Sequence, residues 1–152
     1  MNLTIADFQQ RHKQAFRDLN YEWIATYFEI EDFDKKMLED PTGHILDKGG
    51  AILIAELDGE PVGTCALIRM EEGVFELAKM AVTPRAQGNQ VGYKIGLAVL
   101  EKARDLGAST IFLETNSSLK PAISLYHKLG FSETCGKNSA YSRCNIQMEK
   151  QL

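Results

Sequence analysis

The amino-acid sequence predicts one α/β domain, α+β in type, built on a mixed and mostly antiparallel sheet. Residues 51–82 contain three apolar segments separated by turn signals, as in a meander of antiparallel strands. Residues 76–114 give strand, helix and strand, an order typical of a parallel crossover. A length of 152 residues suits one hydrophobic core, so we expect a single domain over 1–152. It should hold about six to seven strands, about four helices and one central parallel strand pair.

The N-terminal third is predicted to hold one strand and two helices. Residues 2–7 alternate weakly between apolar and polar, which favours a strand. Apolar residues recur every three or four positions over 8–28, which predicts a helix with one apolar face, kinked or broken at Asn20. Residues 29–40 are acidic with the same helical spacing, and Pro41-Thr-Gly43 ends this second helix.

The three strands of the meander are separated by two glycine turns. Residues 51–57 form the first strand, Asp58-Gly59 is a hairpin signal, and residues 60–70 form the second, antiparallel strand. Glu71-Glu-Gly73 is the second turn, and residues 74–82 are the third strand.

The second half alternates between helices and short strands. An apolar stripe over 90–106, closed by Gly107, predicts a long helix. The remaining predicted elements are a strand at 110–114, a helix at 121–129, and strands at 131–135 and 143–149 around a polar loop at 136–142.

Composition and charge narrow the functional classes. A net charge of −4 argues against a general nucleic-acid binder. Since no apolar run approaches the ~18 residues of a membrane span and the N-terminus lacks signal-peptide character, we expect a cytoplasmic protein without a membrane partner. Cys65, Cys135 and Cys144 are too widely spaced for a metal motif or disulfide framework, so no metal is expected and the thiols should stay reduced.

The turn between the third strand and the long helix is the main functional candidate. A strand, a glycine turn and a helix N-terminus expose backbone N–H groups and a positive dipole end, which suits a phosphate. The turn is not a Walker P-loop, because Tyr93, which precedes Lys94, stands where that motif counted from Gly88 needs its second glycine. Nor is it a dinucleotide loop, although Glu114 mimics the ribose-binding acid, because the glycines lie at the wrong spacing and too little chain follows.

The stretch Gln87-Gly-Asn-Gln-Val-Gly92 resembles the acyl-CoA signature of the GNAT superfamily of N-acetyltransferases, Q/R-x-x-G-x-G/A. The preceding strand, Glu76 to Pro84, and the later segment, Ala122 to Phe131, are similar to this family as well. The resemblance implies the acyl-CoA N-acyltransferase fold, in which the central parallel strand pair splits at the CoA site. It also implies transfer of an acetyl group from acetyl-CoA to a primary amine.

The resemblance assigns the CoA contacts to one strand end, one turn and one loop. The residues implied are Met80, Ala81, Val82, Gln87, Gly88, Asn89, Gln90, Gly92, Tyr93 and Asn116. Gln90 departs from the pattern, where glycine is expected; it keeps its N–H, which would still point into the turn if φ at the helix start were negative. Arg85 and Lys94 flank the turn. Each has two alternative roles, to contact a phosphate or to lie on the surface in contact with solvent.

Tyr126 and Glu76 are the candidate catalytic residues. The resemblance implies that Tyr126 protonates the departing thiolate, and the alternative is a tyrosine that merely packs on the sheet. It implies that Glu76, directly or through water, takes the proton from the ammonium of the acceptor, and the alternative is a structural carboxylate. The backbone N–H groups of 80–82 would stabilise the oxyanion.

Several positions leave alternatives open. Asn116 is a candidate for holding pantetheine, because Leu119 stands where the family often has asparagine, but we expect it to cap the following helix. Residues 21–40 correspond to the acceptor region, and acids there, such as Glu29, Glu31, Asp32 and Asp34, would attract an ammonium group or simply face solvent. Gln90 and Leu119 also fit a catalytically silent CoA sensor, and a longer acyl group is a third alternative. The expected partners are acetyl-CoA and the amine, with a homodimer left open.

Overall fold

A seven-stranded sheet forms the centre of the structure, a computed structural model that describes residues 2–134 and 143–152. The strand order is β1-β2-β3-β4-β5-β7-β6. The strands are β1 (Leu3–Asp7), β2 (Ala51–Leu57), β3 (Glu60–Glu71), β4 (Val74–Val82), β5 (Thr110–Thr115), β6 (Ser132–Thr134) and β7 (Ile146–Gln151). In the described residues β4 and β5 pair in parallel, and the other neighbours pair antiparallel. The predicted mixed sheet with one central parallel pair is confirmed.

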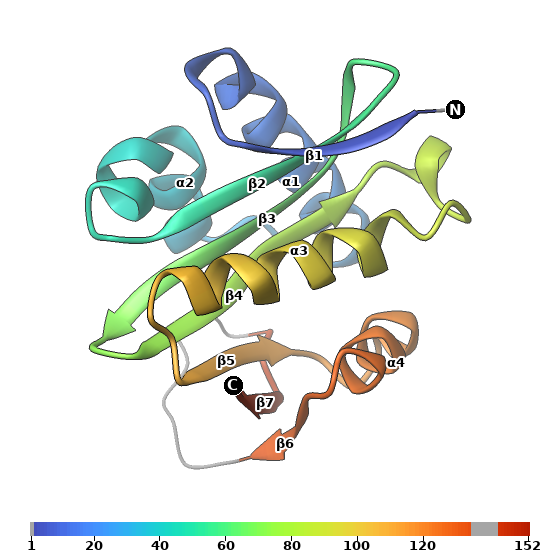
Figure 1. Ribbon diagram of the computed structural model, residues 1–152. Helices are drawn as coiled ribbons and strands as arrows, with labels where there is room; N and C mark the ends of the chain where they lie inside the picture. Colours follow the sequence, from blue (N-terminus) through green and yellow to red (C-terminus); the bar gives the residue numbers. More distant parts are fainter. Residues whose placement is uncertain (1, 135–142) are drawn as a thin grey trace.

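Helices cover both faces of this sheet. Within the described residues the α-helices are α1 (Lys13–Tyr27), α2 (Asp32–Glu39), α3 (Val91–Asp105) and α4 (Lys120–Lys128). Short 3-10 turns span Gln10–His12 and Pro84–Ala86, and a π-helical turn spans Thr42–Leu46. Figure 1 shows α3 on one face of the sheet, with α1 and α2 behind it on the other. None of the described helices is long and apolar enough to cross a membrane.

Strand alternation divides the core between these two helical layers. On β2, Ile52 and Ile54 pack with residues of α1 and α2, whereas Leu53 and Ala55 pack with residues of α3. Successive side chains of a strand point to opposite faces, so a continuous apolar strand is buried on both sides. β2 is therefore a central strand between two cores.

The helix expected at 8–28 differs from its prediction in two respects. The α-helix begins only at Lys13, after the 3-10 turn at Gln10–His12. The break at Asn20 is wrong, because α1 runs without interruption from Lys13 to Tyr27. The buried Asn20 amide donates to Phe16 O at 2.9 Å and to Thr64 Oγ1 on β3 at 3.1 Å. Its polar group is satisfied inside the protein, so the helix does not need to open there.

The predicted turns fall in their expected places. Asp58 and Gly59 both have positive φ, 51° and 86°, as a tight hairpin turn requires, and Gly107 follows α3 with a φ of 84°. β7 begins at Ile146, three residues later than its predicted start, and continues to Gln151. The polar loop predicted at 136–142 and the strand end at Cys135 lie outside the described residues.

Candidate functional site

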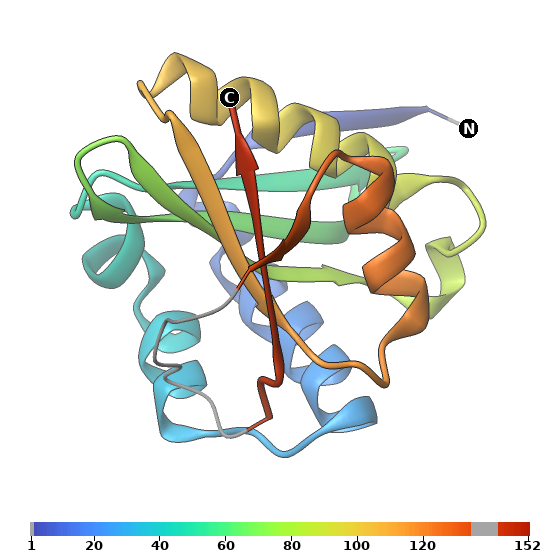
Figure 2. The ribbon, with the colours of Figure 1, turned by 90° about the horizontal axis from the view of Figure 1, so that it is seen from below.

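β4 and β5 pair at one end and separate at the other. Their register covers Val74, Phe75 and Glu76 opposite Thr110, Ile111 and Phe112. Beyond this point β4 continues beside β3 as far as Val82, while β5 stays paired with β7 as far as Thr115. Figure 2 shows the two strands diverging in this region, with α4 beside the opening. The C-terminal half of β4 therefore has one edge without a strand partner in the described residues.

A β-bulge in β4 lies where the strands diverge. On β3, Thr64 pairs with Ala81 and Ala66 pairs with Ala78, so one β3 residue faces two β4 residues, Lys79 and Met80. Lys79 adopts a φ of 54°, the left-handed conformation. Bulges bend a strand and re-aim its side chains. In a regular strand, the alternation of side chains along β4 would turn Met80 away from the α3 side of the sheet. Because of the bulge, Met80 packs towards the α3 side instead.

Two cavities meet in the opening between the strands. The first has a volume of about 90 Å³ and is lined by Asn20, Trp23, Ile24, Phe28, Glu76, Leu77, Ala78, Lys79, Met80, Glu114, Thr115, Asn116, Leu119, Tyr126, Arg143 and Cys144. The second has a volume of about 300 Å³ and is lined by Trp23, Tyr27, Met80, Ala81, Val82, Gln87, Gly92, Ser118, Leu119, Pro121, Ala122, Leu125 and Tyr126. Both lists contain Trp23, Met80, Leu119 and Tyr126, so the cavities adjoin at these side chains.

The glycine turn and the first turn of α3 lie beside the second cavity. Gly88 has a φ of 91°, and a Cβ built there would have no atom within 4 Å. The negative φ set as the condition for Gln90 is not found, because this residue has a φ of 58° and precedes α3 in the left-handed conformation. The helix start leaves backbone N–H groups without helical partners, at the positive end of the helix dipole. The turn thus provides an open site for an anion.

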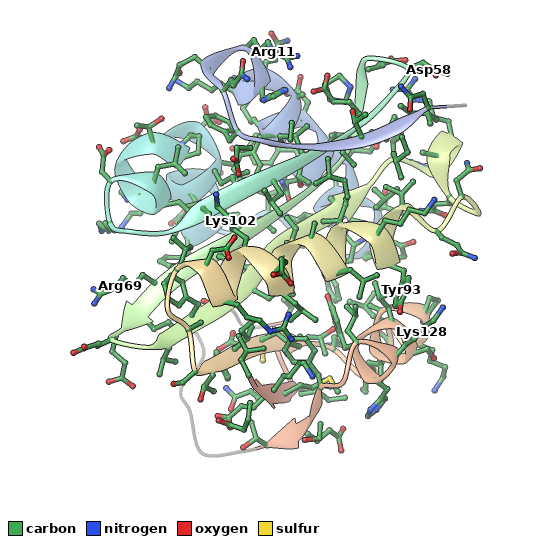
Figure 3. The ribbon with its side chains drawn as sticks, viewed as in Figure 1. Arg11, Asp58, Arg69, Tyr93, Lys102 and Lys128 are labelled. Atoms are coloured by element: carbon green, nitrogen blue, oxygen red, sulfur yellow. The ribbon has the colours of Figure 1, made fainter. Side chains whose placement is uncertain are left out.

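α3 and α4 are in close contact next to this turn. A Cβ at Gly92 would lie 3.3 Å from Leu125 Cδ2, and one at Gly96 only 2.5 Å from Leu129 Cδ1. Figure 3 shows Tyr93 and Lys128 side by side, and Lys128 Nζ lies 4.1 Å from the ring centroid. This cation–π contact fixes Tyr93 between the two helices. The glycine residues of α3 therefore bring α4, and Tyr126 with it, up to the opening.

The structure brings most of the predicted CoA-binding residues together. Met80, Ala81, Val82, Gln87 and Gly92 line the second cavity. Gly88, Asn89 and Gln90 form the adjacent turn, and Tyr93 follows in α3.

The two cationic side chains that flank the turn are both exposed. Arg85 is paired with Glu60 at 2.9 Å, and Lys94 lies on the surface of α3.

Asn116 belongs to the first cavity rather than the second. Its amide donates to Arg143 O at 2.6 Å and its Oδ1 accepts from Ser118 N–H at 2.9 Å. The predicted helix cap is wrong, since Leu119 occupies the N-cap position of α4. Asn116 instead shapes the turn before α4 and connects it to the segment before β7.

Backbone N–H groups of β4 face the opening. Thr83 N–H donates to Val62 O on β3 at 2.9 Å. Because alternate residues of an extended strand direct their N–H groups to opposite edges, the N–H of Val82 points away from β3, towards the side where β4 and β5 separate. A donor in this position could meet a carbonyl oxygen that lies in the second cavity.

Tyr126 is buried where the two cavities adjoin. Its ring packs edge-to-face on Phe131, with ring centroids 6.1 Å apart. Burial, with a smaller contribution from the nearby Cys65, raises the pKa of the Tyr126 hydroxyl well above its ordinary value of 10. The phenol therefore carries its proton at neutral pH and can donate it.

Glu76 and Glu114 place two carboxyl groups in the first cavity, one from each strand of the parallel pair. Burial and the charge of Glu114 raise the pKa of Glu76 to about 7, although Lys79 opposes this shift. Sequence reasoning treated Glu114 only as a mimic of a ribose-binding acid. The sequence feature that could have identified Glu114 as a site residue is a carboxyl group at the end of a buried strand that runs parallel to the strand of Glu76.

A buried ion-pair cluster closes the first cavity on the α2 side. Asp34, which is wholly buried, accepts from Lys79 Nζ at 2.7 Å and from both terminal nitrogens of Arg143 at 2.8 Å. Arg143 also pairs with Glu31 at 3.1 Å. Burial by itself would raise the pKa of Asp34, but the hydrogen bonds and charges of Arg143 and Lys79 outweigh it and lower the pKa to about 2. Lys79 and Arg143 went unnoticed in the sequence because their partner is distant along the chain.

The expected acceptor region does contribute to the first cavity, mainly through apolar residues. Trp23 and Ile24 of α1, and Phe28 directly after it, line this cavity. Of the acids proposed to attract an ammonium group, Asp34 is buried in the ion-pair cluster and the Asp32 side chain is 98% exposed. In the part of the chain that the structure describes, no group of three or more metal-binding side chains occurs.

Comparisons with known proteins agree on one family. The model of the acetyltransferase (GNAT) family matches residues 14–131. The uncharacterized N-acetyltransferase YjgM of Escherichia coli is 38% identical over 112 residues, or 68% of this chain and 65% of YjgM. The chain thus spans slightly less than two thirds of that relative's length.

Solved structures show the same fold over nearly the whole chain. A GNAT acetyltransferase of Staphylococcus aureus matches with a TM-score of 0.88 at 21% identity and covers 99% of both chains. YncA of Salmonella typhimurium, solved with its cofactor acetyl-CoA, matches with a TM-score of 0.80 at 21% identity, over 100% of this chain and 95% of YncA.

Proposed function

Because the chain belongs to the GNAT family of acetyltransferases, we propose that it transfers an acetyl group from acetyl-CoA to a primary amine. The observation that carries this proposal is the meeting of two cavities at Tyr126, with Glu76 on the far side of the junction. One cavity suits the donor and the other suits the acceptor, so both substrates can be present when the acetyl group moves. The reaction then needs no covalent enzyme intermediate.

The second cavity is the proposed donor site. Its larger volume, about 300 Å³, and its apolar wall from β4 and α4 suit the pantetheine arm. The N–H groups from Gly88 to Tyr93 would bind the pyrophosphate at the start of α3. YncA, which shares this fold, was solved with acetyl-CoA, and this supports the same ligand here.

The first cavity is the proposed acceptor site. The ammonium group of the acceptor would lie near Glu76 and Glu114, with its carbon atoms against Trp23 and Phe28. Glu76 has a pKa of about 7, so at neutral pH a large fraction is ionised and able to accept a proton from the amine. The neutral amine then attacks the thioester carbonyl carbon.

The remaining steps use the backbone of β4 and the phenol of Tyr126. The N–H groups on the open edge of β4 would stabilise the oxyanion of the tetrahedral intermediate. When the intermediate collapses, the carbon–sulfur bond breaks and the thiolate of CoA takes the proton of the Tyr126 hydroxyl. As the amide forms, the attacking nitrogen gives up its second proton to water. The products are the N-acetylated amine and CoA, after which Tyr126 recovers a proton from solvent and Glu76 releases the one that it accepted.

The geometry favours acetyl transfer over the two alternatives. A longer acyl chain would enter a cavity of only about 90 Å³ that contains two carboxyl groups, which is unfavourable for apolar carbon. The alternative of a silent CoA sensor rests on Leu119 and on Gln90. This residue nevertheless adopts a left-handed conformation that glycine readily takes, with its N–H still part of the turn.

Release of CoA thiol from acetyl-CoA tests the proposal against a panel of monoamines, polyamines, amino acids and N-terminal peptides. We expect turnover on at least one class, and Tyr126→Phe should lower kcat about 10²- to 10⁴-fold without weakening CoA binding measured by calorimetry. Tyr21→Phe is the matched control, because the Tyr21 hydroxyl bonds Glu39 on the surface. Tight CoA binding without turnover on any amine would favour the sensor, and unchanged turnover in Tyr126→Phe would remove this residue from the mechanism.

A further inference from the structure

Lys79 combines two features that each destabilise the folded protein. It is a non-glycine residue with a φ of 54°, a conformation that costs about 1–2 kcal/mol relative to the right-handed region. Its ammonium-bearing side chain is only 4% exposed, and a buried cation is unfavourable unless it is paired. Glycine at this position would avoid both costs. The side chain of Lys79 is therefore expected to have a role that glycine could not fill.

The pairing of Lys79 connects three separate parts of the chain. Its Nζ lies 2.7 Å from Oδ1 of Asp34 on α2. The same carboxylate receives two hydrogen bonds of 2.8 Å from Arg143, which precedes β7. One buried carboxylate thus holds the β4 bulge, α2 and the segment before β7 together at the wall of the first cavity.

The bulge decides which face of the sheet Lys79 occupies. Residues three positions apart in a regular strand point to opposite faces, so Lys79 would point away from Glu76. With the bulge, both side chains line the first cavity. Thr64 Oγ1 donates to Lys79 O at 2.9 Å, which fixes the backbone of the bulge from β3. The geometry therefore places the Lys79 side chain, ion-paired with Asp34, in the same cavity as the proposed base.

The other groups around Glu76 define the electrostatic setting. Glu114 comes from β5, Tyr126 from α4, and Arg143 and Cys144 from the segment before β7. On the α1 side, Asn20, Trp23, Ile24 and Phe28 are not titratable. Burial and Glu114 both raise the pKa of Glu76, and Lys79 lowers it. Lys79, on the same strand as Glu76, thus opposes the effect of the Glu114 carboxylate on the pKa of Glu76.

We propose that Lys79, held by Asp34, is a positioning residue for acyl transfer that fixes the β4 bulge and maintains the ionised state of Glu76. This inference rests on the proposed function, in which Glu76 accepts the proton of the amine. Lys79 itself touches neither reacting atom in this account. It acts through the backbone of β4 and through the charge of Glu76.

The pH dependence of kcat/KM in Lys79→Met tests this role. Loss of the positive charge should move the acidic limb of the profile to higher pH by about one unit, so that activity at pH 6 falls about tenfold. CoA affinity measured by calorimetry should change less than twofold. Lys79→Arg keeps the charge and should leave the acidic limb close to that of the wild type. Lys35→Met is the control, since the Lys35 side chain is 60% exposed and lies 3.9 Å from Asp32.

A titration of the Glu76 side-chain carboxyl by carbon-13 NMR tests the same charge effect without turnover. Its midpoint should rise by about one unit in Lys79→Met and stay near the wild-type value in Lys79→Arg. If the midpoint and the pH profile in Lys79→Met match the wild type, the inference is wrong. An inactive wild-type protein would refute the proposed function, whereas the NMR titration would still decide whether Lys79 controls Glu76. If Lys79→Met does not fold, the same titration is made on Lys79→Gln.

Discussion

Lys79 and Gln90 share a backbone conformation but differ in what surrounds their side chains. Both are non-glycine residues in the left-handed region, with φ values of 54° and 58°. Lys79 lies in the β4 bulge with its ammonium group buried against Asp34. Gln90 lies at the start of α3, is exposed, and makes no side-chain hydrogen bond that caps the helix.

The difference indicates which part of each residue matters. At Gln90 the turn uses the backbone, and the side chain only adds strain relative to glycine. At Lys79 the side chain offsets the strain through a buried ion pair, so glycine would relieve the backbone but lose the contact. Substitutions at these two sites, and at the partner of Lys79, should therefore have very different effects.

The largest effect is expected for Asp34→Asn, which removes the anion that pairs with Lys79 and Arg143. Breaking a buried ion pair on one side costs about 3–5 kcal/mol of unfolding free energy. Urea unfolding of the variant at pH 7 should show this loss, while Asp32→Asn, whose side chain is 98% exposed, should change stability by less than about 0.5 kcal/mol. Equal stabilities of the two variants would mean that the cluster does not hold the site together.

The contribution of Asp34 to the unfolding free energy should also depend on pH. Its folded-state pKa, about 2, lies below the ordinary value of 3.8. A lowered folded-state pKa stabilises the native protein above the unfolded-state pKa, and this contribution is lost as pH falls through the folded-state value. The stability difference between wild type and Asp34→Asn should therefore be full at pH 6 and shrink between about pH 4 and 2. A constant difference over this range would contradict the assignment.

Lys79→Gly should have an intermediate effect. The glycine gains about 1 kcal/mol from relief of strain but loses the ion pair, so we expect a net loss of about 1–2 kcal/mol in unfolding free energy. Turnover at pH 6 should fall at least about tenfold, as in Lys79→Met. Urea unfolding and thiol release measure both quantities. A stabilised, fully active Lys79→Gly protein would show that Lys79, like Gln90, is needed only for its backbone.

Gln90→Gly should have the smallest effect and the opposite sign. Relief of the left-handed strain should raise the unfolding free energy by about 1 kcal/mol, which corresponds to roughly 2–4 °C in Tm for a chain of this size. CoA affinity should be preserved. Gln90→Ala keeps the Cβ and should leave Tm unchanged, which separates backbone strain from any contact of the side chain. A lower Tm in Gln90→Gly would mean that the glutamine side chain does contribute.

Local patterns predicted most of the fold. The hairpin at Asp58-Gly59 and the amphipathic α3 depend on neighbouring residues, and both appear as expected. The break at Asn20 was wrong because its partner, Thr64, is on β3 and 44 residues away. Long-range hydrogen bonds of this kind leave no trace in a local pattern.

The site was predictable where it follows a motif and unpredictable where it depends on the bulge. The turn from Gln87 to Gly92 and the position of Tyr126 followed from the family resemblance, although their roles remain predictions. The bulge at Lys79 gives no sequence signal, since nothing about lysine favours positive φ. The cluster of Asp34 and Arg143 joins residues 109 positions apart, and only the fold brings them together.

The pH profile of kcat/KM for wild type and Glu76→Gln tests the central claim most directly. With an amine acceptor whose pKa is above 9, the wild type should show an acidic limb with an apparent pKa of about 7, the value expected for Glu76. In Glu76→Gln this limb should disappear, and a much lower rate should rise with pH as more of the amine becomes neutral. An unchanged limb near pH 7 in Glu76→Gln would show that another group accepts the proton.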